Sequence, residues 1–226
     1  MALQILHEDN HLIAVNKPAG WLVQSDRTGD TTLADYVKGY IKDRYNKPGD
    51  VFLGTIHRLD RPVSGVVVFA RTSKALTRMN ELFRKREIEK TYWAVLTDRP
   101  KPIEGTLQHL IKKDPTRNVS RAFDRPTRTS DGAKPAELDY RLIAGIGAQH
   151  LVEIKPKTGR PHQIRVQMAT LKTPIRGDVK YGAREPNEDG SILLHARALD
   201  FTHPVKKEPV HIEAPLPEGQ IWDLFR

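Results

Sequence analysis

One short segment of the sequence has the residue types that chemistry at a carboxylate would need. In His57-Arg58-Leu59-Asp60-Arg61-Pro62, a carboxylate stands between two arginines, directly before a β-branched run of strand length. Asp60 is therefore expected at the rim of a sheet, among cationic neighbours. Taken alone, this pattern is more typical of a surface ion pair or a turn residue than of a catalytic group.

A second segment carries polar and basic side chains that could act together with Asp60. Lys157-Thr158-Gly159-Arg160-Pro161-His162-Gln163-Ile164-Arg165 follows a predicted strand and opens a predicted helix, with Pro161 in its first turn. The helix buries a stripe that contains Ile164 and Met168, and Arg165 is one position off that stripe, so it can reach toward the sheet. A helix start rich in donors binds anions. The alternative is a basic helix start that only caps itself.

With Lys90-Thr91-Tyr92-Trp93, these two segments resemble the three motifs of the RluA-type pseudouridine synthases. The resemblance extends in the family's order from Asn16-Lys17-Pro18-Ala19-Gly20 to Leu193-Leu194-His195-Ala196 and His203-Pro204. It covers nearly the whole chain, and several motifs in that order and at that approximate spacing are specific.

The resemblance implies roles for individual residues. The aspartate that matches Asp60 is the catalytic carboxylate, and the arginine that matches Arg165 pairs with it and orients it. The tyrosine that matches Tyr92 stacks on the target base and helps to move its ring proton, while the arginine that matches Arg58 fills the place of the extruded base. We expect the following residues of these segments to contact RNA: His57, Arg58, Arg61, Lys157, Arg160, His162 and Gln163.

The chemistry that the resemblance implies suits these residue types. Uridine must lose its N-glycosidic bond, rotate while bound and regain a bond through a ring carbon, which calls for an ionised carboxylate beside the sugar. Nothing in this reaction calls for a metal or another cofactor, so none is expected. The bond is inaccessible in a stacked base, so base flipping is needed, and loops of structured RNA such as transfer RNA or large-subunit ribosomal RNA are the expected substrates.

The sequence departs from the family pattern at a few positions. Val63 stands where threonine is usual, Pro161 replaces threonine or serine, and Lys172-Thr173 occupies the place of Gly-His. These changes leave the three matched side chains intact but predict differences in loop geometry and in target choice. The chain is also expected to begin directly at the catalytic domain, without the small RNA-binding domain that some relatives carry.

Composition agrees with an RNA partner. The 226 residues carry 37 Lys and Arg against 28 Asp and Glu, a net charge of +9 that attracts polyanions. Hydrophobic residues make up 38% and charged residues 29%, and cysteine is absent, which excludes thiolate metal sites and disulfides. The N-terminus shows no signal peptide or membrane span, so we expect a cytoplasmic monomer with a single catalytic domain over residues 1–226.

The pattern of apolar residues predicts the elements that must position these side chains. It favours a hairpin over residues 3–16, a helix from Thr32 to the Lys47-Pro48-Gly49 break, a strand over 63–70 and a helix over 73–86. Further strands are predicted at the following ranges: 90–97, 136–143, 151–155 and a short one after His203. The fold class is therefore α+β, and the resemblance implies a mixed, mostly antiparallel central sheet with flanking helices and an RNA-binding cleft.

Residues 101–135 are expected to form a long arm or irregular insertion, because prolines recur there. Basic residues outnumber acidic ones in this segment, and phosphate contact would release counterions. The alternative is a solvated surface loop without a ligand.

Two other functions are weighed against an RNA-uridine isomerase. One is a non-catalytic RNA-binding protein or RNA chaperone, which would have no use for an anionic aspartate where phosphates approach. The other is a hydrolase that uses Asp60 with His57, but the sequence has no second carboxylate spaced to support it. The remaining histidines lack metal-ligand spacing and are expected to be structural or on the surface.

Overall fold

A computed structural model of the protein describes residues 3–26 and 29–226. The chain divides into two compact units, one made of the residues up to Glu89 with Ala196–Pro217, the other of Lys90–His195 with Glu218–Arg226. Each unit carries strands and at least one helix, in agreement with the predicted α+β class. That residues 1–226 act as a single catalytic domain stays a prediction.

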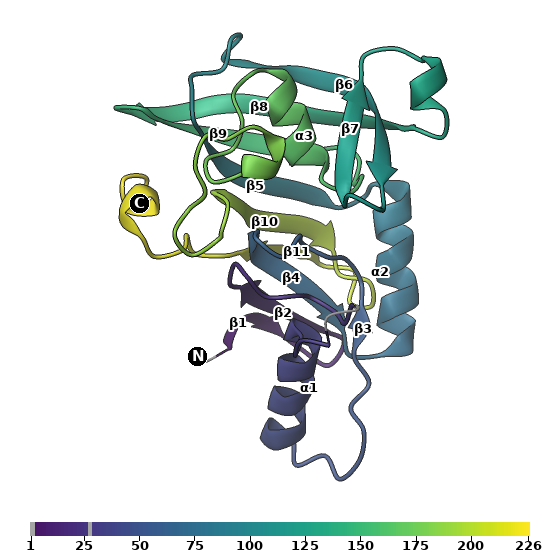
Figure 1. The fold of residues 1–226 in the computed structure, drawn as a ribbon. Coiled ribbons are helices and arrows are strands. Elements are labelled where there is room, and N and C mark those ends of the chain that lie inside the picture. The colour runs from purple at the N-terminus through teal and green to yellow at the C-terminus, as the bar shows by residue number, and fades with distance from the viewer. Residues whose placement is uncertain (1–2, 27–28) are drawn as a thin grey trace. The chain divides into compact units, whose positions relative to one another are not determined.

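The sheet of the first unit has the order β1-β2-β4-β10, with β3 paired to β4 and β11 paired to β10 (Figure 1). The pairs β1–β2, β2–β4, β3–β4 and β10–β11 are antiparallel. The predicted hairpin over residues 3–16 is confirmed as β1–β2. The bounds of these strands are Gln4–Glu8 (β1), Leu12–Lys17 (β2), Gly54–Thr55 (β3), Ser64–Ala70 (β4), Leu194–Thr202 (β10) and Pro209–Glu213 (β11).

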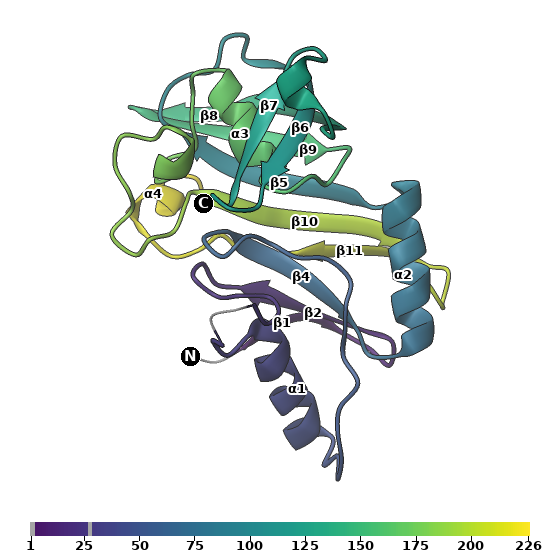
Figure 2. The same ribbon diagram turned by 45° about the vertical axis from the view of Figure 1, so that its right-hand side comes forward.

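Strand β4 is buried along its whole length, as expected for the run Ser-Gly-Val-Val-Val-Phe-Ala. Helix α2 (Ser73–Lys85) packs against it: Ala75 and Met79 belong to the same buried cluster as Val66 and Val68. Figure 2 shows α2 running beside the ends of β4, β10 and β11. The turn that carries Asp60 thus leads directly into a strand whose residues are all buried.

The helices of the first unit begin where their capping residues predict. Helix α1 (Leu33–Arg44) starts at Thr32, whose hydroxyl and Asp35 form a capping box. It ends at Arg44, before the predicted break at residues 47–49. Helix α2 ends at Lys85, and its C-cap residue Arg86 has a left-handed backbone with φ +62°, as is common at helix C-termini.

The second unit is built on the strand order β5-β9-β8-β6-β7, and its neighbouring strands pair antiparallel. Strands β5 and β9, which are far apart in the sequence, are neighbours in this sheet, and Tyr92 lies opposite Ile154. Helix α3 packs on β6 and β7, and Val166 joins Ile111 and Ala136 in a small core. The bounds are Glu89–Leu96 (β5), Glu104–Asp114 (β6), Val119–Phe123 (β7), Lys134–Ile146 (β8), Gln149–Pro156 (β9), Gln163–Thr170 (α3), Gln220–Asp223 (α4), Arg128–Ser130 (η1) and Val179–Tyr181 (η2).

Residues 101–135, expected to form a long arm or an irregular insertion, are mostly regular in structure. Most of this segment forms the antiparallel hairpin β6–β7, which is joined to the sheet by pairing of β6 with β8. Pro102, Pro115 and Pro126 lie outside the strands, where their missing N–H groups cost no ladder hydrogen bond. The charged residues are tolerated because Lys112 and Arg121, which lie opposite each other, are exposed, while Ile111 next to Lys112 on β6 is buried.

The expected position of Pro161 is wrong. Helix α3 begins at Gln163, so Pro161 precedes the helix instead of occupying its first turn, and His162 at the N-cap has φ +53°. The sequence reasoning also missed β10, although His195 within it is fully buried, as expected for a structural histidine.

Candidate active site

Asp60 lies in a short turn that leads into β4. Its carbonyl oxygen accepts a hydrogen bond from Val63 N at 3.0 Å. Leu59 and Val63 on either side are buried, at 8% and 3% exposure, while Asp60 itself is half-buried. The apolar neighbours therefore anchor the turn, and Asp60 is more accessible than either of them.

Lys17 and Gly20 fix this turn from the other side. Lys17 is fully buried, and its Nζ donates to the carbonyl oxygens of Pro18 at 2.9 Å, Trp21 at 2.8 Å and Arg61 at 3.1 Å. Gly20 N donates to the same Arg61 carbonyl at 2.8 Å, and Arg61 Nε donates back to Gly20 O at 2.9 Å. The residue after Asp60 is thus held by both its backbone and its side chain.

The electrostatics of Lys17 follow from its burial. Burial lowers the pKa of Lys17 to about 7, the negative charge of Asp60 opposes that shift, and the cation of Arg61 adds to it. Because the Asp60 charge acts on the ammonium group, the charges of Lys17 and Asp60 are coupled to each other within the first compact unit.

The other members of this motif have different surroundings. His57 Nε2 accepts a hydrogen bond from Val68 N at 3.0 Å, and its ring stacks on Phe83 with centroids 5.2 Å apart. These contacts join the turn to β4 and α2. Arg58 is exposed, as is Arg61, whose guanidinium also pairs with Asp30 at 3.0 Å. Arg58 is thus placed to meet a large ligand, whereas His57 is held within the fold.

A hollow of about 200 Å³ adjoins this turn. Trp21 and the 46% exposed Tyr36 meet there with ring centroids 4.4 Å apart. Its lining consists of Gly20, Trp21, Leu22, Asp30, Thr31, Tyr36 and Arg61.

Tyr92 and Arg165 belong to the second unit. Tyr92 is half-buried on β5, just before the fully buried run Ala94–Leu96 that anchors the strand. Arg165 is on α3, and its side chain is only 6% exposed. Its Nε donates to Asp178 Oδ2 at 2.7 Å and its Nη2 to Asp178 Oδ1 at 2.8 Å. Arg165 is therefore buried, whereas its expected reach toward the sheet stays a prediction.

The remaining residues of the Arg165 segment fall into two groups. Gln163 is 4% exposed: its Oε1 accepts from Thr158 at 2.7 Å and Arg160 N at 3.0 Å, and its Nε2 donates to Glu137 O at 3.0 Å. We therefore assign Gln163 a structural role instead of the expected RNA contact.

Lys157, Arg160 and His162 are more accessible than Gln163. Lys157 pairs with Glu137 at 2.8 Å and Asp139 at 3.1 Å, while Arg160 Nε donates to Pro135 O at 2.8 Å. Their RNA contacts, and the meeting of Asp60 with Tyr92 and Arg165, stay predictions.

Sequence reasoning missed Asp178, Tyr181 and the burial of Lys17. The first two lie in Gly177-Asp178-Val179-Lys180-Tyr181-Gly182, where the glycines have φ of +84° and +104°. The sequence did contain a signal for these two residues, because an aspartate and a tyrosine stand there between two glycines that permit a tight turn. Among the described residues, no group of three or more histidine and acidic side chains is arranged to hold a metal ion.

Comparison with known proteins decides the family. The model of the RNA pseudouridylate synthase family matches residues 11–170, which include Asp60, Tyr92 and Arg165. The chain belongs to this family. An uncharacterized RNA pseudouridine synthase of Zymomonas mobilis is 33% identical over 97% of this chain and 96% of its own length.

Two longer relatives carry names that specify an RNA. The tRNA pseudouridine synthase C of Pectobacterium carotovorum is 32% identical over 94% of this chain, and the ribosomal large subunit pseudouridine synthase C of Escherichia coli is 34% identical over 95%. This chain spans 58% and 67% of their lengths, respectively.

Solved structures agree with the predicted fold. Human RNA pseudouridylate synthase domain containing 4 superimposes with a TM-score of 0.77 at 28% identity, covering 95% of this chain and 88% of that one. Human RNA pseudouridylate synthase domain containing 1 gives 0.74 at 26% identity, over 96% and 84%. The fold is the pseudouridine synthase fold. In the described part of the chain, no helix is long and apolar enough to cross a membrane.

Proposed function

We propose that this protein isomerises specific uridines of structured RNA to pseudouridine, with Asp60 as the catalytic carboxylate. The observation that carries the proposal is the family match over residues 11–170, which contains Asp60, Tyr92 and Arg165. The net charge of +9 supports an RNA substrate.

The reaction assigns each side chain a task. The bond between uracil N1 and the ribose C1′ breaks, the detached base turns, and a bond between C5 and C1′ forms; C5 then loses its proton, and N1 ends protonated. Asp60 acts as an anion beside the sugar, Arg165 orients it, and the ring of Tyr92 holds the base while its hydroxyl helps to move the proton. Because the base must leave the stack, a uridine in a loop costs the least energy to extrude.

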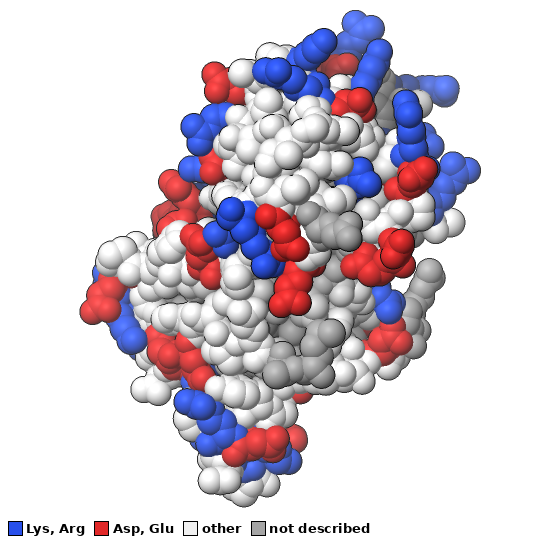
Figure 3. Space-filling view, turned by 90° about the vertical axis from the view of Figure 1, so that its left-hand side faces the viewer, with Lys and Arg blue, Asp and Glu red and all other residues white. Residues whose placement is uncertain are grey.

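The RNA backbone is expected to lie on the hairpin β6–β7. Figure 3 shows lysine and arginine side chains gathered at the top of the view, at the height of β6, β7 and β8 in Figure 1. The exposed basic residues of the hairpin are Lys112, Arg117 and Arg121, while the exposed Arg125 and Arg128 follow it and Lys134 begins β8. Such contacts hold RNA without reading its sequence.

The RNA itself is either transfer RNA or large-subunit ribosomal RNA, since relatives are named for each. A monomeric state and a cytoplasmic location are part of the same proposal. Size-exclusion chromatography with light scattering checks the first, and cell fractionation checks the second.

The deciding experiment maps pseudouridine in total RNA from cells with and without this protein. The deletion is complemented with wild type, with Asp60→Asn, or with Asp50→Asn as an exposed control in the same unit. Sites that vanish on deletion and return with wild type and Asp50→Asn, but not with Asp60→Asn, support the proposal and identify the RNA. If no site changes, the non-catalytic RNA-binding function replaces it.

A further inference from the structure

We propose that Asp178 and Tyr181 form a seat for Arg165, and that Tyr181 ties this seat to the basic hairpin β6–β7. The inference rests on the proposed function, because it assigns Asp178 and Tyr181 as positioning residues for that reaction. All of the contacts that carry it lie within the second unit.

Asp178 fixes the plane of the Arg165 guanidinium. The two side chains are buried, at 6% and 1% exposure, and they form paired hydrogen bonds of 2.7 and 2.8 Å along the Nε–Nη2 edge. Paired bonds to a carboxylate allow little rotation of the guanidinium. A guanidinium has five N–H groups, and the contact with Asp178 uses two of them, on the Nε–Nη2 edge. Asp178 thus fixes the orientation of the whole guanidinium.

Tyr181 supports the same group from its face. The Arg165 Cζ atom lies 5.0 Å from the centroid of the Tyr181 ring, within the range of a cation–π contact. The turn η2 brings the two seat residues together, since Tyr181 N donates to Asp178 O at 3.0 Å. Gly177 permits this turn: with φ +84°, a Cβ there would lie 2.6 Å from Asn187 Nδ2. The seat is therefore a compact local structure.

The Tyr181 hydroxyl joins the seat to the hairpin. It accepts a hydrogen bond from Ser120 N at 2.7 Å and contacts His162 Nδ1 at 2.7 Å. His162 Nε2 contacts Lys113 Nζ at 3.1 Å. An ammonium group only donates, so Nε2 accepts, and Nδ1 carries the hydrogen that it donates to the Tyr181 oxygen.

Ser120 and Lys113 lie opposite each other on β7 and β6, in the hairpin assigned to the RNA backbone. One phenol therefore has two separable functions. Its ring supports the arginine, and its oxygen holds the hairpin. RNA bound on the hairpin and the orientation of Arg165 are coupled through it.

The test separates the rate of the chemical step from RNA affinity. RNA from cells that lack this protein serves as substrate, and pseudouridine at the mapped site is followed in single turnovers with enzyme in excess; affinity is measured by filter binding with the same RNA. Asp178→Asn should slow the single turnover by about 10²-fold, because a small misplacement of a catalytic group has an effect of that order. RNA affinity should stay within about threefold. Glu153→Gln, which removes the carboxylate of the exposed Arg141 pair on β9, serves as the control and should leave both quantities at wild-type levels.

Two variants of Tyr181 separate the ring from the hydroxyl. Tyr181→Phe keeps the ring and should weaken RNA binding with little change in rate, whereas Tyr181→Leu should also slow the single turnover. Tyr140→Phe, which removes another buried hydroxyl from this unit, is the matched control and should change neither quantity.

The double variant Arg165→Ala, Asp178→Asn shows whether Asp178 acts through Arg165. It should be no slower than Arg165→Ala alone if the two act as one group. An unchanged rate in Asp178→Asn, equal losses of rate and affinity, or additive losses in the double variant overturn the proposal. If Asp178→Asn does not fold by circular dichroism, equal rates for Tyr181→Phe and Tyr181→Leu overturn it instead. A wild-type protein that forms no pseudouridine would contradict the proposed function itself, before any variant is compared.

Discussion

The ammonium group of Lys17 and the carbonyl oxygen of Arg61 lie 3.1 Å apart, although 44 positions separate these residues in the chain. The contact joins the end of β2 to the residue that follows Asp60. A fully buried lysine at this place is costly unless its hydrogens are used, and here they are donated to backbone carbonyls. The turn that carries the proposed catalytic carboxylate is thus held from inside the fold.

Replacing Lys17 by Met should loosen this turn. The exchange removes the ammonium donor from the Pro18 and Trp21 carbonyls and leaves the Arg61 carbonyl with Gly20 N alone, a loss that is partly offset because no ammonium is buried. We expect a net loss of about 2 kcal/mol in unfolding free energy, measured by urea denaturation. The rate of pseudouridine formation should fall as well. Lys38→Met, on the exposed face of α1, should leave both the stability and the rate at wild-type values. If Lys17→Met is as stable and as active as wild type, Lys17 does not hold the turn in place.

Tyr92→Phe tests the assignment of its hydroxyl to proton movement. The ring that stacks on the base is kept, so RNA affinity should stay within about threefold, while single turnovers slow by about 10²-fold. The measurement is pseudouridine formation with enzyme in excess. Tyr140→Phe supplies the control, since its hydroxyl only donates to Pro102 O inside the fold. Wild-type rates in Tyr92→Phe would restrict Tyr92 to stacking.

Charge removal on the hairpin should weaken RNA binding in a salt-dependent manner. Lys112 and Arg121 lie opposite each other on β6 and β7, and both are exposed. Changing both to Gln should lower affinity and reduce the slope of log affinity against log salt by about 0.7 for each lost phosphate contact. Filter binding at several salt concentrations measures the slope. Arg141→Gln is the control: it removes an arginine that is already paired with Glu153, so it should leave the slope unchanged. If the control and the double variant have the same effect, the hairpin is not the RNA surface.

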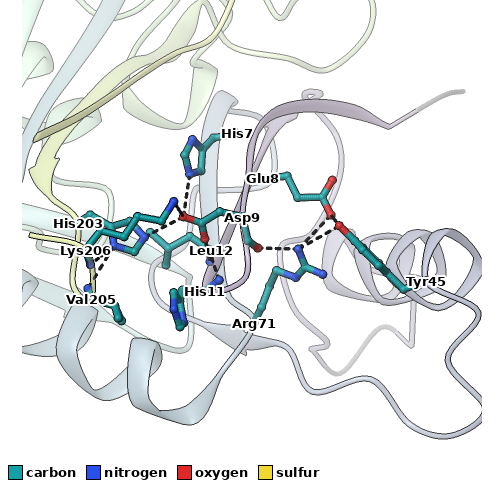
Figure 4. Close-up of polar contacts among 10 residues, drawn as sticks. All are labelled: His7, Glu8, Asp9, His11, Leu12, Tyr45, Arg71, His203, Val205 and Lys206. Atoms are coloured by element: carbon teal, nitrogen blue, oxygen red, sulfur yellow. Dashed lines mark hydrogen bonds and ion pairs between the residues drawn. The ribbon is translucent and has the colours of Figure 1, made fainter. Parts of the chain in front are cut away.

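His203 should make the protein sensitive to mild acid. Figure 4 shows it beside Asp9, with Lys206, His7 and His11 nearby. Its Nδ1 accepts from Val205 N at 3.2 Å and from Lys206 N at 2.8 Å, and Nε2 lies 3.0 Å from Asp9 Oδ2. Burial lowers the pKa of His203 below its ordinary 6.5, while Asp9 opposes the shift and Lys206 and His11 add to it.

The sign of the effect follows from proton binding. Below pH 6.5 the unfolded chain takes up a proton that the folded state resists, so stability is lost as pH falls through 6.5 toward the lower folded pKa. His203→Asn keeps an acceptor for the two N–H groups but cannot be protonated. Its stability relative to wild type should therefore improve as pH falls from about 7 to about 5 in urea titrations. A constant difference across this range would contradict the prediction, and His150→Asn on β9 provides the control.

The sequence by itself determined the local elements and the family. Capping at Thr32, the helical spacing of the apolar residues from Leu76 to Phe83, and the β-branched run before Ala70 depend on neighbours in the chain, so α1, α2 and β4 were predictable. The order of the motifs that contain Asp60, Tyr92 and Arg165 was readable for the same reason, since it is a property of the linear chain. The prolines of residues 101–135, in contrast, misled local reasoning, because only pairing with β8 shows that β6 is a strand.

Only the tertiary structure decided which partner each charged group has. Arg165 is paired with Asp178 across 13 positions, and Lys17 donates to carbonyls that lie 4 and 44 positions further along the chain. Gln163, expected at RNA, is instead buried against Glu137. Such contacts depend on which surfaces pack together, and burial then decides whether a polar group must find a partner inside the protein. Periodicity and motif spacing carry no record of that packing.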